Sequence, residues 1–326
     1  EFFVKENSIV CTGTYGKSTS TAILTWLFRE LDYDPSYMFG GISLNNMSAA
    51  ELTNGKYSIL EGDEYKSSRW DNGPKFAHYS PTHLLLTSVV WDHADVYPTE
   101  KSYFDAFQEL INGMPKNGMI VASENVSHIT YHISQVITYG QSEDANYQYK
   151  NIKSTKDGIE FEIVFRDTCY VIRANVLGDY MADNMTGCFA LAHTMGIEPE
   201  KIIKHLASFK NIKRRLEKKY DDNITVFDDI AHSPKKAEAV LRSIKKIYNK
   251  KIIAIFEPNS GNRQPESIPG YDNVFVNADE VIIPKLTRIK RDPNKPAPID
   301  GKQLAKIISK THKNVQYIEE DEELIE

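Results

Sequence analysis

A short loop near the start of the chain carries the residues best suited to bind an anion. Residues 11–21 read CTGTYGKSTST, in which Lys17 and Ser18 directly follow a glycine. In a phosphate loop, a lysine at this place contacts the β- and γ-phosphates of ATP, and the next hydroxyl ligates Mg²⁺. The general pattern has a further glycine where this chain has Cys11. The loop is therefore either a nucleotide site of unusual sequence or an ordinary turn whose lysine faces solvent.

The elements around this loop favour the nucleotide site. The segment NSIVCTG is a short apolar run that predicts a strand, and STSTAILTWLFRELDY has apolar residues at helical spacing. A loop between a strand and a helix brings backbone N–H groups and the positive helix end together at one anion. The predicted cofactor-binding residues here are Gly13, Thr14, Gly16, Lys17, Ser18 and Thr19.

Acidic side chains follow two further predicted strands. KYSILEGDEY places Glu61 and Asp63 at the end of one strand, and THLLLTSVVWDHADVYP places Asp92 and His93 at the end of another. Continuous apolar runs suit a parallel sheet covered on both faces, whose ligand crevice lies at the carboxyl ends of the strands. Glu61 is the natural carboxylate ligand for Mg²⁺, and His93 could ligate a second metal or contact the transferring phosphate.

Each of these residues has a structural alternative. Taken alone, an acidic cluster such as Asp63 and Glu64 is typical of solvated surface, although it could also support the metal ligands. A single histidine such as His93 is more often a structural hydrogen-bonding group.

The rest of the chain predicts an α/β fold with two domains. Residues 139–178 alternate between polar and apolar and indicate a small antiparallel sheet, and a helical stretch over about 180–209 closes the first domain. We predict a P-loop-type central ATPase domain with a mostly parallel sheet over 1–211. A Rossmann-like α/β domain follows over 212–326, and we expect it to be incomplete because it ends in an acidic tail without closing elements.

The second domain offers its own polar residues. VFDDIAHSP places Asp228, Asp229 and His232 between a strand and a helix, where they either contact nucleotide or cap the helix. NIKRRLE places Arg214 and Arg215 at the domain junction, where they either clamp phosphate or form salt bridges between the domains.

The composition argues against several classes of protein. Of the 326 residues, 41% are hydrophobic and 26% are charged, which is the balance of a soluble globular protein. The sequence has no long apolar run and no secretory signal layout, so we expect a cytoplasmic protein without membrane contact. The net charge of -6 argues against nucleic-acid binding. The three widely spaced cysteines favour a reducing compartment.

Together these segments resemble the Mur ligase superfamily, the ATP-dependent amide-bond-forming enzymes of peptidoglycan synthesis. The loop of that family runs GT, then His or Asn, then GK and Thr or Ser, so GTYGKS departs only at Tyr15. The resemblance covers nearly the whole chain. It implies that this family has no glycine at the position of Cys11.

The segments downstream resemble one branch of that superfamily. This is the recycling branch, which joins L-alanyl-γ-D-glutamyl-meso-diaminopimelate to UDP-N-acetylmuramate through an acyl phosphate. The branch that adds L-alanine shares the loop and is the alternative, and a degenerate ATP-binding regulatory module is another. The implied enzyme is an ADP-forming carboxylate–amine ligase that uses ATP and Mg²⁺. The segments are GGISLNNMSA, EGDEYKSSRWDNGPKFAHYSP, TSVVWDHADVYP, RRLE, DDIAHSP and IAIFEPNS.

The resemblance also implies roles for single residues in the first domain. Lys17 and Ser18 serve phosphate and Mg²⁺, Glu61 ligates Mg²⁺, and His93 helps to place a second metal or the acyl phosphate. Asn184 matches the second asparagine of an adenine-contacting motif whose first two positions here are Tyr180 and Met181.

In the second domain, the resemblance implies that Arg215, Asp229 and His232 contact the nucleotide. Asn259 stands where recycling ligases usually have arginine. The resemblance further implies an N-terminal UDP-binding domain ahead of residue 1, and we expect a monomer or weak dimer.

Overall fold

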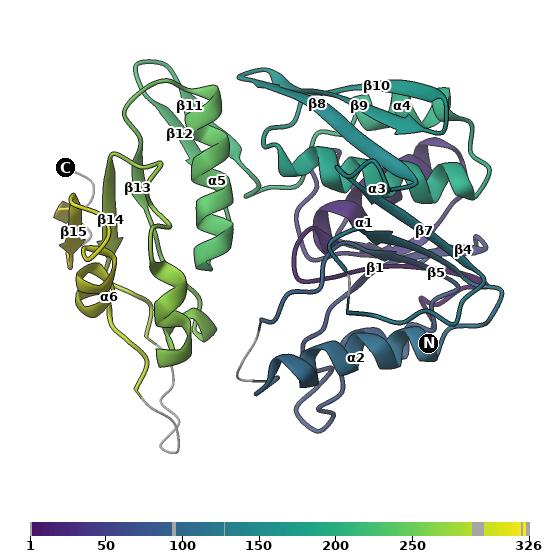
Figure 1. Cartoon of the computed structure of the whole chain (residues 1–326), viewed down its shortest axis with the longest axis horizontal. Helices are drawn as coiled ribbons and strands as arrows, with labels where there is room; N and C mark the ends of the chain where they lie inside the picture. The colour runs from purple at the N-terminus through teal and green to yellow at the C-terminus, as the bar shows by residue number, and fades with distance from the viewer. Residues whose placement is uncertain (1, 93–95, 127, 289–296, 321, 324–326) are drawn as a thin grey trace. The chain divides into compact units, whose positions relative to one another are not determined.

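The structure is a computed structural model, which describes residues 2–92, 96–126, 128–288, 297–320 and 322–323. It divides into two compact units, Glu1–Lys213 and Arg214–Glu326, which are described one at a time below (Figure 1).

Over the described residues, the first unit is built on a ten-stranded mixed sheet in the order β10-β9-β8-β7-β6-β5-β1-β4-β2-β3. In this order, all neighbouring strands from β8 across to β2 pair in parallel, whereas β3 at the edge pairs antiparallel with β2. This confirms the mostly parallel sheet predicted from the sequence. The strands are β1 Asn7–Thr12, β2 Ser36–Met38, β3 Ala50–Glu51, β4 Tyr57–Gly62, β5 His83–Leu86, β6 Met119–Ser123, β7 Gln135–Gly140, β8 Tyr147–Thr155, β9 Gly158–Phe165 and β10 Thr168–Ala174.

Helices cover both faces of this sheet. Along β1, Ile9 and Cys11 pack with α1, α3 and α4, whereas Val10 packs on the opposite face with α2. Figure 1 shows α2 on one side of the sheet and α1 and α3 on the other. Burial on both faces explains why the parallel strands read as continuous apolar runs. The helices are α1 Lys17–Glu30, α2 Glu100–Asn112, α3 Tyr180–Thr194, α4 Pro199–Ala207 and the short 3₁₀ helix η1 Lys75–His78.

Two predicted elements of the first unit differ in detail from the structure. The antiparallel strands β8, β9 and β10 extend the main sheet, because β8 pairs in parallel with the end of β7. The helical stretch predicted over 180–209 is broken into α3 and α4. The break falls at Gly196, whose φ of 88° lies in the left-handed region that ends helices, and Pro199 then starts α4.

The second unit is a smaller α/β arrangement. A parallel sheet in the order β13-β14-β15 lies beside α5 and α6, and β11 and β12 form a separate antiparallel pair. Among the apolar residues of α5, Ala237 and Leu241 are buried, and Val240, Ile244 and Ile247 are half-buried. The elements are β11 Glu217–Asp221, β12 Thr225–Asp228, α5 Pro234–Ile247, β13 Ile253–Ile255, η2 Gly261–Arg263, η3 Pro265–Tyr271, β14 Glu280–Pro284, α6 Gly301–Ile308 and β15 Val315–Ile318.

Within the ranges that the structure describes, every helix is too short or too polar to cross a lipid bilayer.

Candidate nucleotide-binding site

The loop of residues 13–16 connects β1 to the N-terminus of α1 and requires glycine twice. Gly13 has a φ of 139° and Gly16 a φ of 86°, values that side chains with a Cβ rarely adopt. A Cβ on Gly13 would lie 2.4 Å from Thr87 Oγ1, and a Cβ on Gly16 would lie 2.4 Å from Asn184 Oδ1. The first N–H groups of α1 have no partner within the helix, so the loop presents donors to an anion.

The segment after β5 holds the loop from the side. The Thr14 N–H donates to Ser88 O at 3.1 Å, the Thr14 hydroxyl donates to Val90 O at 2.8 Å, and the Tyr15 N–H donates to Ser88 Oγ at 2.9 Å. The apolar run predicted a strand that continues to Trp91, but β5 ends at Leu86. The strand ends early because the residues after Leu86 bind the loop instead of a neighbouring strand.

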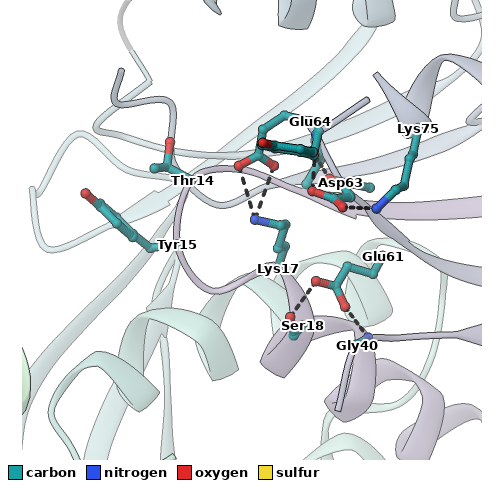
Figure 2. Close-up of polar contacts among 12 residues, drawn as sticks. Thr14, Tyr15, Lys17, Ser18, Gly40, Glu61, Asp63, Glu64 and Lys75 are labelled. Atoms are coloured by element: carbon teal, nitrogen blue, oxygen red, sulfur yellow. Dashed lines mark hydrogen bonds and ion pairs between the residues drawn. The ribbon is translucent and has the colours of Figure 1, made fainter. Parts of the chain in front are cut away.

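Lys17 does not face solvent. Its side chain is 16% exposed, and its Nζ lies 3.1 and 3.2 Å from the two carboxylate oxygens of the fully buried Glu64 (Figure 2). Burial acts to lower the pKa of Lys17, but the carboxylates of Glu64, Glu61 and Asp63 outweigh it, and the pKa is raised. Lys17 is therefore a charged group paired within the protein, and the expectation that it faces solvent is wrong.

Two of the three predicted metal ligands of this unit, Ser18 and Glu61, meet at the start of α1. Ser18 Oγ donates to Glu61 Oε1 at 2.5 Å, and the Gly40 N–H donates to the other oxygen of Glu61 at 2.5 Å (Figure 2). Ser18 comes from the first turn of α1 and Glu61 from the carboxyl end of β4. The contact brings one hydroxyl and one carboxylate together beside the phosphate loop.

The rest of the acidic cluster is paired rather than solvated. Asp63 lies 2.5 Å from Lys75 Nζ and accepts from the Tyr65 N–H at 3.2 Å. Burial acts to raise the pKa of Asp63, but Lys75 and Lys17 outweigh it, and the pKa is lowered. Because Asp63 is half-buried and paired and Glu64 is fully buried, the expectation of solvated surface is wrong for this cluster. Sequence reasoning did not identify Lys75, which lies at the start of η1, as part of this cluster.

Two tyrosines that sequence reasoning missed support the same loops. The Tyr103 hydroxyl lies 2.9 Å from Thr14 Oγ1, and the Tyr97 hydroxyl donates to the backbone oxygen of Glu64 at 2.6 Å. Aromatic residues at such positions indicate core packing, so their pattern gives no sign of the polar contact.

Comparison with known proteins places this site in a family. Residues 11–192 match the Mur ligase middle domain, and residues 214–326 match the Mur ligase, glutamate ligase domain. The chain belongs to the Mur ligase family. The superfamily predicted from the sequence is thereby confirmed, and the prediction of an ATP-dependent, ADP-forming amide ligase is confirmed at the level of the family.

Several Mur ligases are similar over most of this chain. The UDP-N-acetylmuramate–L-alanine ligase of Caldicellulosiruptor saccharolyticus is 28% identical over 329 residues, which cover 98% of this chain and 70% of that protein. The UDP-N-acetylmuramate–L-alanyl-γ-D-glutamyl-meso-2,6-diaminoheptandioate ligase of Haemophilus influenzae is 33% identical over 264 residues, which cover 77% of this chain and 57% of that protein.

The fold is also that of a solved Mur ligase. The crystal structure of the UDP-N-acetylmuramate–alanine ligase of Thermotoga maritima has a TM-score of 0.77 at 23% identity, and the match covers 98% of this chain and 68% of that chain. The predicted fold class is therefore confirmed. The chain spans roughly 57% to 70% of the length of these relatives.

The Mur ligase middle domain brings most of the predicted site residues together. Asn184, which is 5% exposed, lies beside the loop because its Oδ1 faces Gly16. Thr19 is buried in the first turn of α1. His93 lies outside the described residues. The residues that meet at the loop are Gly13, Thr14, Gly16, Lys17, Ser18, Thr19, Glu61 and Asn184.

The predicted residues of the second Mur ligase unit organise its first loops. Asp229 accepts from the Leu216 N–H at 2.8 Å and from the Ala231 N–H at 2.7 Å, so it joins two loops and does not cap α5. Burial raises the pKa of Asp229, although these two N–H groups and then Arg215 act against it. His232 Nδ1 lies 2.8 Å from the Ile230 oxygen.

The salt bridge found at the junction lies within one unit. Arg214 Nε lies 3.3 Å from Asp228 Oδ1, and both residues belong to the second unit.

The donor set beside the loop fits Mg²⁺. Among the described residues, no group of three or more His, Cys, Asp or Glu side chains is arranged to hold a metal ion. Mg²⁺ is usually bound by one or two carboxylates together with water and substrate phosphates, and a hydroxyl ligand is typical of phosphate loops. Ser18 and Glu61 supply that set of oxygens, and nucleotide phosphates and water would complete it.

Proposed function

We propose that this chain is the nucleotide-binding part of a ligase that joins an amine to the carboxylate of UDP-N-acetylmuramate at the expense of ATP. One observation carries the proposal: Lys17 and the Ser18–Glu61 pair lie together at the N-terminus of α1, in a chain of the Mur ligase family. A lysine, a hydroxyl and a carboxylate at this place are the groups that phosphoryl transfer needs.

The proposed reaction has two steps. The muramyl carboxylate oxygen attacks the γ-phosphorus of ATP, which forms an acyl phosphate and releases ADP. The acceptor amine then attacks the carbonyl carbon, the amide bond forms, and inorganic phosphate leaves with the electrons of the broken C–O bond. The amine loses a proton in this step.

The chain contributes positioning and charge to these steps. Lys17 and the N–H groups of α1 bind the β- and γ-phosphates and offset the charge that develops during transfer. Ser18 and Glu61 would hold Mg²⁺, which when bound neutralises phosphate charge. His93 is proposed to help place a second metal or the acyl phosphate, and Asn184 to contact the nucleotide.

Three residues of the second unit are proposed to complete the nucleotide site. Arg215, Asp229 and His232 lie on neighbouring loops, and Asp229 binds the loop of Leu216 to its own. This proposal assigns nucleotide binding to a central domain over 1–211 and a closing role to the domain over 212–326.

L-Alanine is the proposed acceptor. Relatives named as L-alanine ligases match this chain over 85% to 100% of its length. The recycling activity favoured by the sequence motifs is less well supported. It remains a second candidate because the Haemophilus influenzae peptide ligase is 33% identical, a higher value than that of the Caldicellulosiruptor relative.

Phosphate release tests the function and separates the two acceptors. The full-length protein is incubated with ATP, Mg²⁺ and UDP-N-acetylmuramate, and phosphate is measured with L-alanine or with the diaminopimelate-containing tripeptide. We expect release that depends on L-alanine and that is lost in K17M. Release only with the tripeptide would establish the recycling ligase. Nucleotide binding without release on either acceptor would point to a regulatory module.

A further inference from the structure

The closest charged partner of the phosphate-loop lysine has no role in the proposed reaction. Both carboxylate oxygens of Glu64 contact the Lys17 ammonium, at 3.1 and 3.2 Å (Figure 2). The Glu64 side chain is fully buried and that of Lys17 is 16% exposed. Lys17 Nζ donates a hydrogen bond to Glu64 Oε1 and lies within ion-pair distance of Oε2, so one of the three N–H donors of the ammonium is already used by Glu64.

Glu64 is fixed in its position by the residues around it. Its backbone oxygen accepts from the Tyr97 hydroxyl at 2.6 Å. Burial, and next the charge of Glu64, raises the pKa of both Tyr97 and Tyr103, so both phenols lie within the field of this carboxylate. Tyr103 in turn contacts Thr14 at 2.9 Å. The hydrogen bond from Tyr97 holds the Glu64 backbone, and the full burial of its side chain confines the carboxylate when the longer lysine side chain moves.

At this position, Glu64 competes with the nucleotide for the Lys17 ammonium. In the proposed reaction the phosphates of ATP bind the Lys17 ammonium, and in this structure that ammonium is paired with Glu64. Glu64 is also an anion next to the place where the phosphates would bind, and charges interact more strongly in a buried site than at the surface. Nucleotide binding therefore exchanges one anionic partner of Lys17 for another.

We propose that Glu64 is a positioning residue that holds Lys17 in the nucleotide-free loop and limits the affinity of the loop for nucleotide. The inference rests on the proposed function, because it requires that the loop binds adenine nucleotides. Without nucleotide, Glu64 neutralises Lys17 and keeps the ammonium at the loop. When the phosphates bind, Lys17 turns towards them, and when ADP leaves, Glu64 takes the ammonium back.

Isothermal titration of the whole chain with ADP and Mg²⁺ tests this exchange. Glu64→Gln keeps the size of the side chain and removes its charge, so Lys17 loses its competing partner. We expect E64Q to bind ADP about tenfold more tightly than the wild type. If Glu64 only supports the loop structurally, E64Q would bind ADP equally or more weakly, and that result would overturn the inference.

Stability measurements test the ion pair separately. E64Q and K17M each leave one buried charge without its partner, whereas the double variant removes both charges. We expect the melting temperature of the double variant to exceed the value that adding the two single losses predicts. Additive losses would show that the pair is not formed. D105N is the matched control, because it removes a carboxylate from the exposed Lys101–Asp105 pair, and it should leave ADP affinity unchanged.

The remaining outcomes are distinguishable. If E64Q does not fold, E64D shortens the side chain while keeping its charge, and we expect it to bind ADP about two- to threefold more tightly than the wild type. Equal or weaker binding by E64D would overturn the inference. If the wild-type chain does not bind ADP, the proposed function and this inference fail together. If it binds ADP and the variants show no gain, only the inference fails.

Discussion

At the scale of single residues, Glu61 links the predicted metal site to the loop. Its two oxygens accept from Ser18 Oγ and from the Gly40 N–H, so the side chain is already oriented. We expect the factor by which Mg²⁺ raises ADP affinity to be about tenfold smaller in E61Q than in the wild type. The reason is that an amide is a weaker ligand for a hard cation than a carboxylate. Titration of ADP with Mg²⁺ and with EDTA measures the gain. E160Q, which neutralises a carboxylate on β9 that pairs with Arg173, should retain the gain in full.

Asp183 gives the fold a dependence on pH. Burial raises its pKa to about 7 against the hydrogen bond from the Tyr149 hydroxyl, and Glu124 adds to the rise. Between pH 3.8 and about 7 the folded protein therefore binds more protons at this site than the unfolded chain does. Stability must then fall as pH rises through this window, by as much as about 4 kcal/mol from this group.

D183N tests this dependence, because asparagine does not titrate. We expect the variant to be more stable than the wild type above pH 7. Its free energy of unfolding should also decline much less between pH 4 and about 7 than that of the wild type. Thermal unfolding at several pH values measures both. Identical pH profiles for the two proteins would contradict the assignment.

At the scale of elements, the phosphate loop depends on a backbone conformation and on a neighbouring helix. Gly16 combines a φ of 86° with a clash at 2.4 Å between a Cβ and Asn184 of α3, whereas Gly196, with a φ of 88°, has no atom within 4 Å of such a Cβ. We expect G16A to lose ADP binding and to cost more than the ~1 kcal/mol of stability that G196A costs. Equal effects of the two variants in unfolding and ADP titration would show that α3 does not confine the loop.

The sequence predicted local elements well and contacts between distant segments poorly. The strand β1, the loop and α1 follow from apolar spacing and from the glycines, because these signals lie within a few residues of one another. The burial of Glu64 against Lys17 joins residues 47 positions apart, and the contact of Asn184 with Gly16 joins α3 to the loop. These contacts depend on how β4 and α3 pack against α1, which no local pattern records.

The same reason explains the errors at single elements. The apolar residues after Leu86 continue the strand pattern, but their backbone binds the phosphate loop. The family resemblance identified the superfamily correctly, because its loop and strand-end motifs are short and local. The acceptor depends on residues whose side chains meet only in the folded protein, and the motifs favoured the recycling branch while most of the similar relatives are L-alanine ligases.

At the scale of the whole molecule, the two units have separate hydrophobic cores. The first unit has one core on each face of its sheet, and the second has a core between its sheet and helices. A domain with its own core can fold alone. We therefore expect a fragment of residues 1–213 to unfold cooperatively on heating and to bind ADP, because Lys17, Ser18 and Glu61 all belong to it.

The affinity of this fragment decides what the second unit adds. If Arg215, Asp229 and His232 contact the nucleotide, the fragment should bind ADP at least about tenfold more weakly than the whole chain, since each charged contact that is lost costs about 1.5–3 kcal/mol. H232A in the whole chain should then reproduce part of the loss. A fragment that binds ADP as tightly as the whole chain would confine nucleotide recognition to the first unit and leave those three residues to organise their own loops.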